Sequence, residues 1–299
     1  MTEVQSNASV GRPLPVPSRE ELPPLLARTP LAIIDEALTF LRINPAMFFG
    51  LAAIVVLPLQ LLILLLPGSS LRGNRPDRTV DILISSIDQP SAVANGFGAL
   101  VFESIALFTV AAIYGEITAA WYARTSISMP DLLKSSLKRS PVIIAVWVVT
   151  HVAIVFGGII SLGLLAVIIG SFFIVAAPAM GAEGLGVADT LRRSRQLANA
   201  KFIHCLIVFV AVAGAGQVMD LSLRFAPTFL LNQLDVPVWI TGGVFDVVAS
   251  VVVVAFTAAT SVVLYLDLRV RREGIDLYMA LDRSFDSSKA ISKALRFRG

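Results

Sequence analysis

The chain has 299 residues, of which 56% are hydrophobic and only 15% are charged, and its mean hydropathy is +0.80. Soluble domains carry about 25% charged residues, so this composition excludes an ordinary soluble domain. The net charge is a modest +3, and the single cysteine, Cys205, excludes an intrachain disulfide.

The N-terminal segment, residues 1–30, is rich in proline and contains no long apolar run. A secretory signal peptide needs a continuous apolar stretch, which this segment does not have. We therefore expect residues 1–30 to form a disordered or loosely draped cytoplasmic tail.

Six long apolar stretches occupy most of the remaining chain. They are Pro45–Leu66, Val93–Trp121, Pro141–Ile160, Leu162–Pro178, Phe202–Leu221 and Val238–Leu266. A helix needs roughly 20 apolar residues to cross a hydrocarbon core about 30 Å thick. Segments of this length satisfy their backbone groups in lipid only as helices. The sequence therefore predicts an all-α, polytopic membrane helix bundle with six transmembrane helices, over residues 31–276.

The distribution of basic residues predicts the orientation of this bundle. If both termini are cytoplasmic, all but four of the 24 lysines and arginines lie on the cytoplasmic side. The exceptions, in outer loops, are Arg72, Arg75, Arg78 and Arg224. Lys and Arg concentrate in cytoplasmic loops, so we expect a multi-pass protein of the bacterial plasma membrane with both termini cytoplasmic.

Three units, each an amphipathic helix followed by a polar corner and a hairpin of two spans, organise the predicted bundle. The amphipathic segments are Asp35–Pro45, Asp131–Pro141 and Asp189–Asn199. The first two end at Asn-Pro and Ser-Pro corners, because proline ends one helix and starts the next. The apolar stripe of the first is expected at Leu31, Ile34, Leu38 and Leu41.

Two interpretations of these amphipathic segments stay open. They lie in the headgroup plane, where their basic residues attract anionic lipid of the inner leaflet, or they only orient the spans.

The connections within the hairpins differ in length. The loop Gly68–Ala92 is long enough to contact an extracytoplasmic partner, whereas Gly157–Gly163 leaves almost no loop. Glycines in the short connection let its two helices approach closely. The small residues Ala211–Ala215 allow tight contacts, either within the chain or between chains.

The last span continues into a charged motif at residues 265–277, Tyr-Leu-Asp-Leu-Arg-Val-Arg-Arg-Glu-Gly-Ile-Asp-Leu. Arg269, Arg271 and Arg272 hold the cytoplasmic end of the span, and Gly274 ends its helix. Asp276 is a suitable cap for a further helix, Leu277–Phe285, in a basic cytoplasmic tail that covers residues 277–299.

This motif, together with residues 178–194, resembles the corresponding segments of bacterial, chiefly actinobacterial, six-span integral membrane proteins. These are related to the membrane domain of glycerophosphoryl diester phosphodiesterases. The resemblance covers roughly residues 30–280 and implies a six-span domain with an accessory role. In the fused enzymes the hydrolase is a separate soluble barrel, and this chain has no such barrel. Phosphodiesterase activity is therefore not carried over.

Four polar side chains within the apolar stretches form a candidate intramembrane site. They are Glu103, Glu116, His151 and Asp246. An acid inside a span is costly, so it usually marks a function or a partner. We expect no Lys or Arg within any span, which leaves protonation, a hydrated cavity, hydrogen bonds to His151, Thr109 or Ser250, or a base on another subunit. Glu103 and Asp246 are expected to face one cavity or one partner.

The basic residues near the inner leaflet form a second candidate site, for anionic lipid or a docking partner. They are Lys138, Arg139, Arg192, Arg193, Arg269, Arg271 and Arg272. No aromatic platform lies between them, so nucleic-acid binding is not indicated. No nucleotide-binding, metal-binding or nucleophile motif is recognised, so we predict neither a cofactor, a metal nor an enzymatic activity.

Two functions remain open. The first is a non-enzymatic integral membrane scaffold or accessory subunit that docks membrane or cytoplasmic proteins, or a further copy of itself, in cell-envelope biogenesis. The second is a transporter or lipid-handling protein that uses the intramembrane acids. The same-orientation repeat favours the scaffold, because secondary transporters commonly have inverted repeats.

Overall fold

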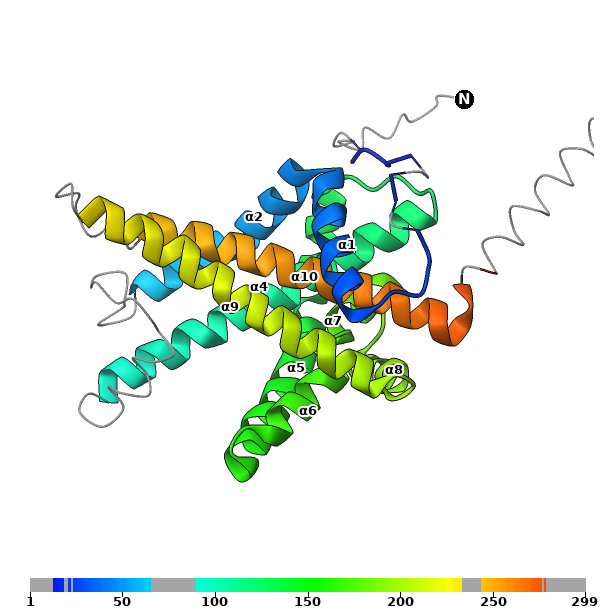
Figure 1. Ribbon diagram of the computed structural model, residues 1–299. Coiled ribbons are helices and arrows are strands. Elements are labelled where there is room, and N and C mark those ends of the chain that lie inside the picture. Colours follow the sequence, from blue (N-terminus) through cyan, green and yellow to red (C-terminus); the bar gives the residue numbers. More distant parts are fainter. Residues whose placement is uncertain are drawn as a thin grey trace, which may run out of the picture.

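A computed structural model describes residues 13–18, 21–22, 24–65, 90–232, 243–275 and 277. Figure 1 shows a helical bundle without strands in this part of the chain. The helices are α1 (Pro30–Ile43), α2 (Pro45–Leu65), α4 (Pro90–Tyr122), α5 (Met129–Ser161), α6 (Leu164–Phe173), α7 (Ala176–Glu183), α8 (Val187–Asn199), α9 (Phe202–Asn232) and α10 (Phe245–Glu273).

Six segments of these helices are long and apolar enough to cross a membrane. Five lie within single helices, and the sixth, Leu164–Glu183, combines α6 and α7 across a break at Ile174–Val175. The predicted all-α polytopic bundle with six membrane-crossing segments is therefore confirmed.

Helix α10 is the central element of the bundle. It packs against α1, α2, α4 and α9, and most of its side chains from Ala249 to Val270 are buried. Small residues such as Ala255, Ala258 and Ala259 lie among them and are fully buried. Small side chains let helices approach closely where lipid supplies no hydrophobic driving force between them. Figure 1 shows α9 along the front of α10, with the α5–α6 hairpin projecting away from both.

An aromatic cluster joins α1, α2 and α4 near the start of the bundle. The ring centroid of Phe48 lies 4.6 Å from that of Phe40, 4.8 Å from Tyr114 and 5.6 Å from Trp121. The Tyr114 hydroxyl donates a hydrogen bond of 2.6 Å to the Phe48 carbonyl, so the buried phenol is satisfied.

Glycines set the close packing of α7 on α4. A Cβ atom added to Gly181 would lie 1.9 Å from the carbonyl oxygen of Ala112, and one added to Gly115 would lie 2.4 Å from that of Pro178. Any side chain at either position would therefore push the two backbones apart. In the α5–α6 hairpin, a Cβ at Gly157 would lie 2.7 Å from the side chain of Ile169, which confirms the predicted close approach.

The three-unit organisation is confirmed in its first and third units and wrong in the second. Helix α1 ends at Ile43, with Asn44 as its C-cap before Pro45, and α8 ends at Asn199 before α9 starts at Phe202. Helix α5 instead runs without a corner from Met129 through Pro141 to Ser161. The Ser128 hydroxyl caps the first turn by accepting a hydrogen bond from the Asp131 amide. The helix therefore starts at Met129, twelve residues before the proline.

Proline removes one helical hydrogen bond and leaves the carbonyl four residues earlier without its donor. Here that carbonyl belongs to Leu137, which is 75% exposed. Near the end of a membrane helix, water or headgroups satisfy such a group, which explains why Pro141 does not stop α5.

The buried face of α1 differs from the predicted stripe. Its buried residues are Ile33, Ala37, Phe40 and Leu41. Leu31 is 74% exposed, because the bundle packs on the neighbouring face, which carries Phe40. Among the four stripe positions only Leu41 is buried.

The described part of the N-terminal segment, for which a disordered or loosely draped tail is expected, forms hydrogen bonds with the bundle. The Leu14 amide donates to the Ile127 carbonyl at 2.8 Å, and Arg124 donates to the Pro17 carbonyl at 2.8 Å. Residues 68–89 of the expected outer loop lie outside the described residues, as does the expected helix Leu277–Phe285 apart from Leu277 itself.

Candidate functional site

The guanidinium group of Arg224 in α9 lies against three carboxylates, which come from three helices. Its nitrogens lie 2.8 Å from Asp246 Oδ1, 2.6 Å from Asp220 Oδ1 and 3.5 Å from Glu103 Oε1. Glu103 comes from α4 and Asp246 from the first turn of α10, whereas Asp220 lies one turn before Arg224 in α9. These four residues are called the Arg224 cluster.

Two neutral side chains extend this cluster to α2. Ser250 Oγ donates to Glu103 Oε1 at 3.1 Å and accepts bonds from Gln60 Nε2 at 2.9 Å and Arg224 Nη2 at 3.2 Å. Gln60 is 2% exposed. The cluster therefore connects α2, α4, α9 and α10 through polar side chains.

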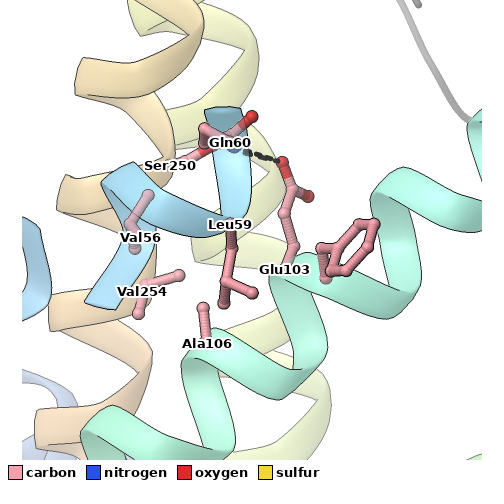
Figure 2. A pocket seen from close by; sticks show the side chains of 8 residues that line it. Val56, Leu59, Gln60, Glu103, Ala106, Ser250 and Val254 are labelled. Carbon is pink, nitrogen blue, oxygen red and sulfur yellow. Dashed lines mark hydrogen bonds between the residues drawn. The ribbon is translucent and has the colours of Figure 1, made fainter. Parts of the chain in front are cut away.

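The space beside the cluster is a narrow crevice rather than a channel. Figure 2 shows Gln60, Glu103 and Ser250 together at one end of it, with apolar side chains along the rest. Its remaining walls are Val56, Leu59, Phe102, Ala106 and Val254. The crevice is too narrow to admit a water molecule, so the described residues enclose no hydrated cavity at this place.

The surroundings of Arg224 explain how its charge is tolerated. It lies within helix α9, and its side chain is only 14% exposed. The three acids around it reduce the cost of removing it from water.

The structure corrects the expectation that no base lies within a span. Helix α9 does not end near Leu221 but continues to Asn232, which carries Arg224 with it instead of leaving it in a loop. The convergence of Glu103 and Asp246 is as predicted, but their shared partner is a base of the same chain. The i,i+4 spacing of Asp220 and Arg224 was a signal for a continuing helix that hydropathy alone does not register.

The other two residues of the candidate intramembrane site lie elsewhere. His151 Nδ1 lies 2.9 Å from the carbonyl of Trp147 in its own helix, and the two rings stack at 4.7 Å. Thr109 likewise donates to its own helix, at the Ile105 carbonyl. Glu116 is partly exposed on α4 and forms no hydrogen bond or ion pair with the described residues.

A second polar cluster closes the opposite end of the bundle, where α7, α8 and α10 meet. Arg193 Nη2 lies 2.7 Å from Glu183 Oε1, and Arg193 also pairs with Glu273. Arg269 pairs with Glu273 at 2.9 Å, and the Tyr265 hydroxyl donates to Glu183 at 2.7 Å. These five residues are called the Arg193 cluster. Burial opposes the charge of Arg193, but hydrogen bonds to Glu273 and Glu183 outweigh it and raise the pKa of the guanidinium above its ordinary value.

Asp267, beside this cluster, ties the N-terminal segment to α10. Its carboxylate is fully buried and accepts a 2.6 Å bond from the backbone amide of Arg28. Arg271 pairs with Asp267 at 2.8 Å and donates to the Arg28 carbonyl at 2.5 Å. His204 Nε2 lies 3.2 Å from the same carboxylate. Both backbone polar groups of Arg28, in the chain before α1, are thus held by α10.

These contacts divide the seven predicted docking residues into two groups. Arg193, Arg269 and Arg271 form ion pairs within the chain, and Arg139 donates to the Gly181 carbonyl at 3.4 Å. Lys138, Arg192 and Arg272 are exposed. Glu183 and Glu273 are not evident from the sequence as partners of Arg193, because they lie 10 and 80 residues from it. Asp267 and Glu273 could have been found from their i,i+4 spacing to Arg271 and Arg269.

The part of the chain that the structure describes contains no group of three or more His, Cys, Asp or Glu side chains arranged to hold a metal ion. Comparison with family models, with curated proteins and with solved structures gave no match to this chain. The resemblance to the phosphodiesterase-related membrane proteins therefore stays a prediction from the quoted residues.

Proposed function

We propose that this protein is a non-enzymatic integral membrane scaffold, an accessory subunit that docks an acidic segment of a protein partner at the inner leaflet. In this proposal it lies in the bacterial plasma membrane with both termini cytoplasmic and serves cell-envelope biogenesis. The observation that carries the proposal is the set of bases that remains exposed after the pairs within the chain have formed.

The part of this set on α5, α8 and the end of α10 is called the basic surface. Its residues are Lys134, Lys138, Arg192, Arg195 and Arg272. Helix α8 contacts both α5 and α10, so these bases belong to neighbouring elements at one end of the bundle. Among the described residues, exposed Asp189 pairs only with Arg192, at 3.4 Å. Bases held at a fixed site on rigid helices favour an acidic protein partner through electrostatic complementarity.

The Arg224 cluster supports the scaffold over the transporter. Its acids face a guanidinium of the same chain, and the adjoining crevice admits no water. A path for an ion needs hydrated or exchangeable sites along its length. A cluster that joins four helices suits a rigid platform better.

The test is affinity purification of the tagged protein from native membranes in mild detergent, followed by mass spectrometry of co-eluting proteins and lipids. We expect a stoichiometric protein that is lost when Lys138→Glu and Arg195→Glu are combined, because neither base has an ion pair to lose. Asp189→Asn on the same surface is the matched control and should retain the partner. Recovery of one lipid class without a protein, or a partner indifferent to the charge reversal, would contradict the scaffold.

A further inference from the structure

Helix α9 presents an exposed face with a regular spacing of positions. The face consists of Ile203, Ile207, Val210, Gly214, Gln217 and Leu221, and is called the α9 stripe. All six residues are exposed. Their spacing alternates between four and three residues, which is the pattern of a helix that packs against another along a left-handed crossing. The stripe is about 27 Å long, close to the thickness of the hydrocarbon core.

A polar side chain distinguishes this face from the other lipid-facing surfaces. Gln217 lies inside the apolar window Phe202–Arg224, is exposed, and forms no hydrogen bond with the described residues. The exposed face of α5 is apolar by comparison, with residues such as Val148, Val152 and Phe156. An unpaired amide in lipid is unfavourable, and Gln side chains within membranes hydrogen-bond across helices.

We propose that two copies of this chain associate through the α9 stripe, with the two Gln217 amides hydrogen-bonded across a twofold axis along the membrane normal. A membrane protein inserts in one orientation, so α9 helices of two copies meet in parallel and place identical positions opposite each other. An amide has both donor and acceptor, so it is complementary to itself about such an axis. A second copy presents the same amide at the same level of the same helix, so self-complementarity favours association between copies of this chain.

Gly214, one turn before Gln217, supplies the close approach that these amides need. A Cβ atom added to Gly214 would meet no atom of its own chain within 4 Å. Packing within the chain therefore does not account for a glycine here, whereas Gly216 faces Val253 of α10. A glycine on the outer face lets the backbone of a second helix come near.

Cysteine cross-linking in vesicles tests this interface directly. Cys205, the single native cysteine, is buried and is first replaced by alanine. Val210→Cys then places one thiol on the stripe, and Ile54→Cys places one at comparable exposure on α2 as the control. The purified variants are reconstituted in vesicles of phosphatidylcholine and phosphatidylglycerol, diluted with lipid and oxidised. Disulfides form only where Cα atoms approach to roughly 4.4–6.8 Å, so we expect dimer from Val210→Cys and monomer from Ile54→Cys.

Gln217→Leu supplies the second arm. It keeps the face apolar and exposed, so the chain is expected to fold, and it should raise the dissociation constant of the dimer by about three- to tenfold. Val218→Leu, at the edge of the stripe, should leave that constant unchanged. The proposal would be overturned by equal cross-linking at both cysteines or by a dimer that Gln217→Leu does not weaken. It would also be overturned if the same cysteine, tested in native membranes, cross-linked only to another protein.

Discussion

At the N-terminal end of α10, Asp246 shares a single guanidinium, that of Arg224, with Glu103 and Asp220. At the C-terminal end, Glu273 is held by two guanidinium groups, those of Arg193 and Arg269. Among the described residues, the first cluster has one cation, that of Arg224, whereas the second offers each carboxylate more than one partner. Loss of one base should therefore be far more damaging at the first end than at the second.

Replacement of Arg224 by leucine is the largest expected effect. It leaves three carboxylates together at low exposure without their shared cation, and we expect a loss of about 3–5 kcal/mol in the free energy of unfolding. Reversible unfolding in mixed detergent and sodium dodecyl sulfate measures it. Arg224→Lys keeps the charge but loses the planar fork, so it should restore part of the stability. Adding Asp246→Asn to Arg224→Leu should also recover stability; additive losses would show that the two residues do not interact.

Asp267→Asn tests the attachment of the N-terminal segment and should cost less. The amide keeps one acceptor for the Arg28 backbone but loses its charge toward Arg271, and a hydrogen bond to a charged group contributes about 1.5–3 kcal/mol. We expect the chain before α1 to detach locally, so trypsin cleavage after Arg28 should accelerate roughly tenfold while the bundle stays folded. His204→Gln is the control for the same carboxylate, and an unchanged cleavage rate in Asp267→Asn would rule out the attachment.

Arg193→Gln should have a smaller effect than Arg224→Leu, although both arginines contact more than one acid. After the change, Glu183 still accepts from the Tyr265 hydroxyl and Glu273 still pairs with Arg269. These side chains are also partly hydrated, so we expect a loss of about 1–2 kcal/mol in the same unfolding assay. When Arg269→Gln is also present, Glu273 has neither arginine, so the loss of unfolding free energy caused by Arg193→Gln should be larger. A loss equal to that of Arg224→Leu would remove the distinction between the two ends.

Arg192→Gln is the smallest expected effect, and it calibrates the others. Its pair with Asp189 spans one helical turn, and the two side chains are 69% and 64% exposed. Exposed pairs of this kind contribute about 0–0.5 kcal/mol, so the unfolding midpoint should barely move. A shift as large as that of Arg193→Gln would indicate that exposure does not separate these two neighbouring arginines.

The sequence predicts local features of this protein well and contacts between distant segments poorly. Stretches such as Pro45–Leu66 and Phe202–Leu221 predict membrane helices because hydropathy over 20 residues is a local property. Asn44–Pro45 likewise marks a helix end that the structure confirms. The corner expected at Pro141 is wrong, because α5, capped at Ser128, continues through the proline, whose freed carbonyl belongs to the exposed residue Leu137.

The candidate site divides in the same way. Glu103 and Asp246 stand out in the sequence because carboxylates are rare in apolar stretches. Their partner Arg224 was missed, since a hydropathy window ends where α9 in fact continues. His151 was grouped with them for its polarity, but its ring is satisfied by its own helix at Trp147.

By itself the sequence determined that this protein lies in a membrane and how many helices are long and apolar enough to cross it. Each apolar segment satisfies its own backbone hydrogen bonds as a helix, so this result does not depend on how the helices pack. The tertiary structure alone decided which charges meet. Gln60, Glu103, Arg224 and Ser250 are contributed by four helices, and their contacts depend on how those helices pack around α10. Packing of this kind is set by shape complementarity between distant segments, such as Gly181 against Ala112, which no local pattern of residues records.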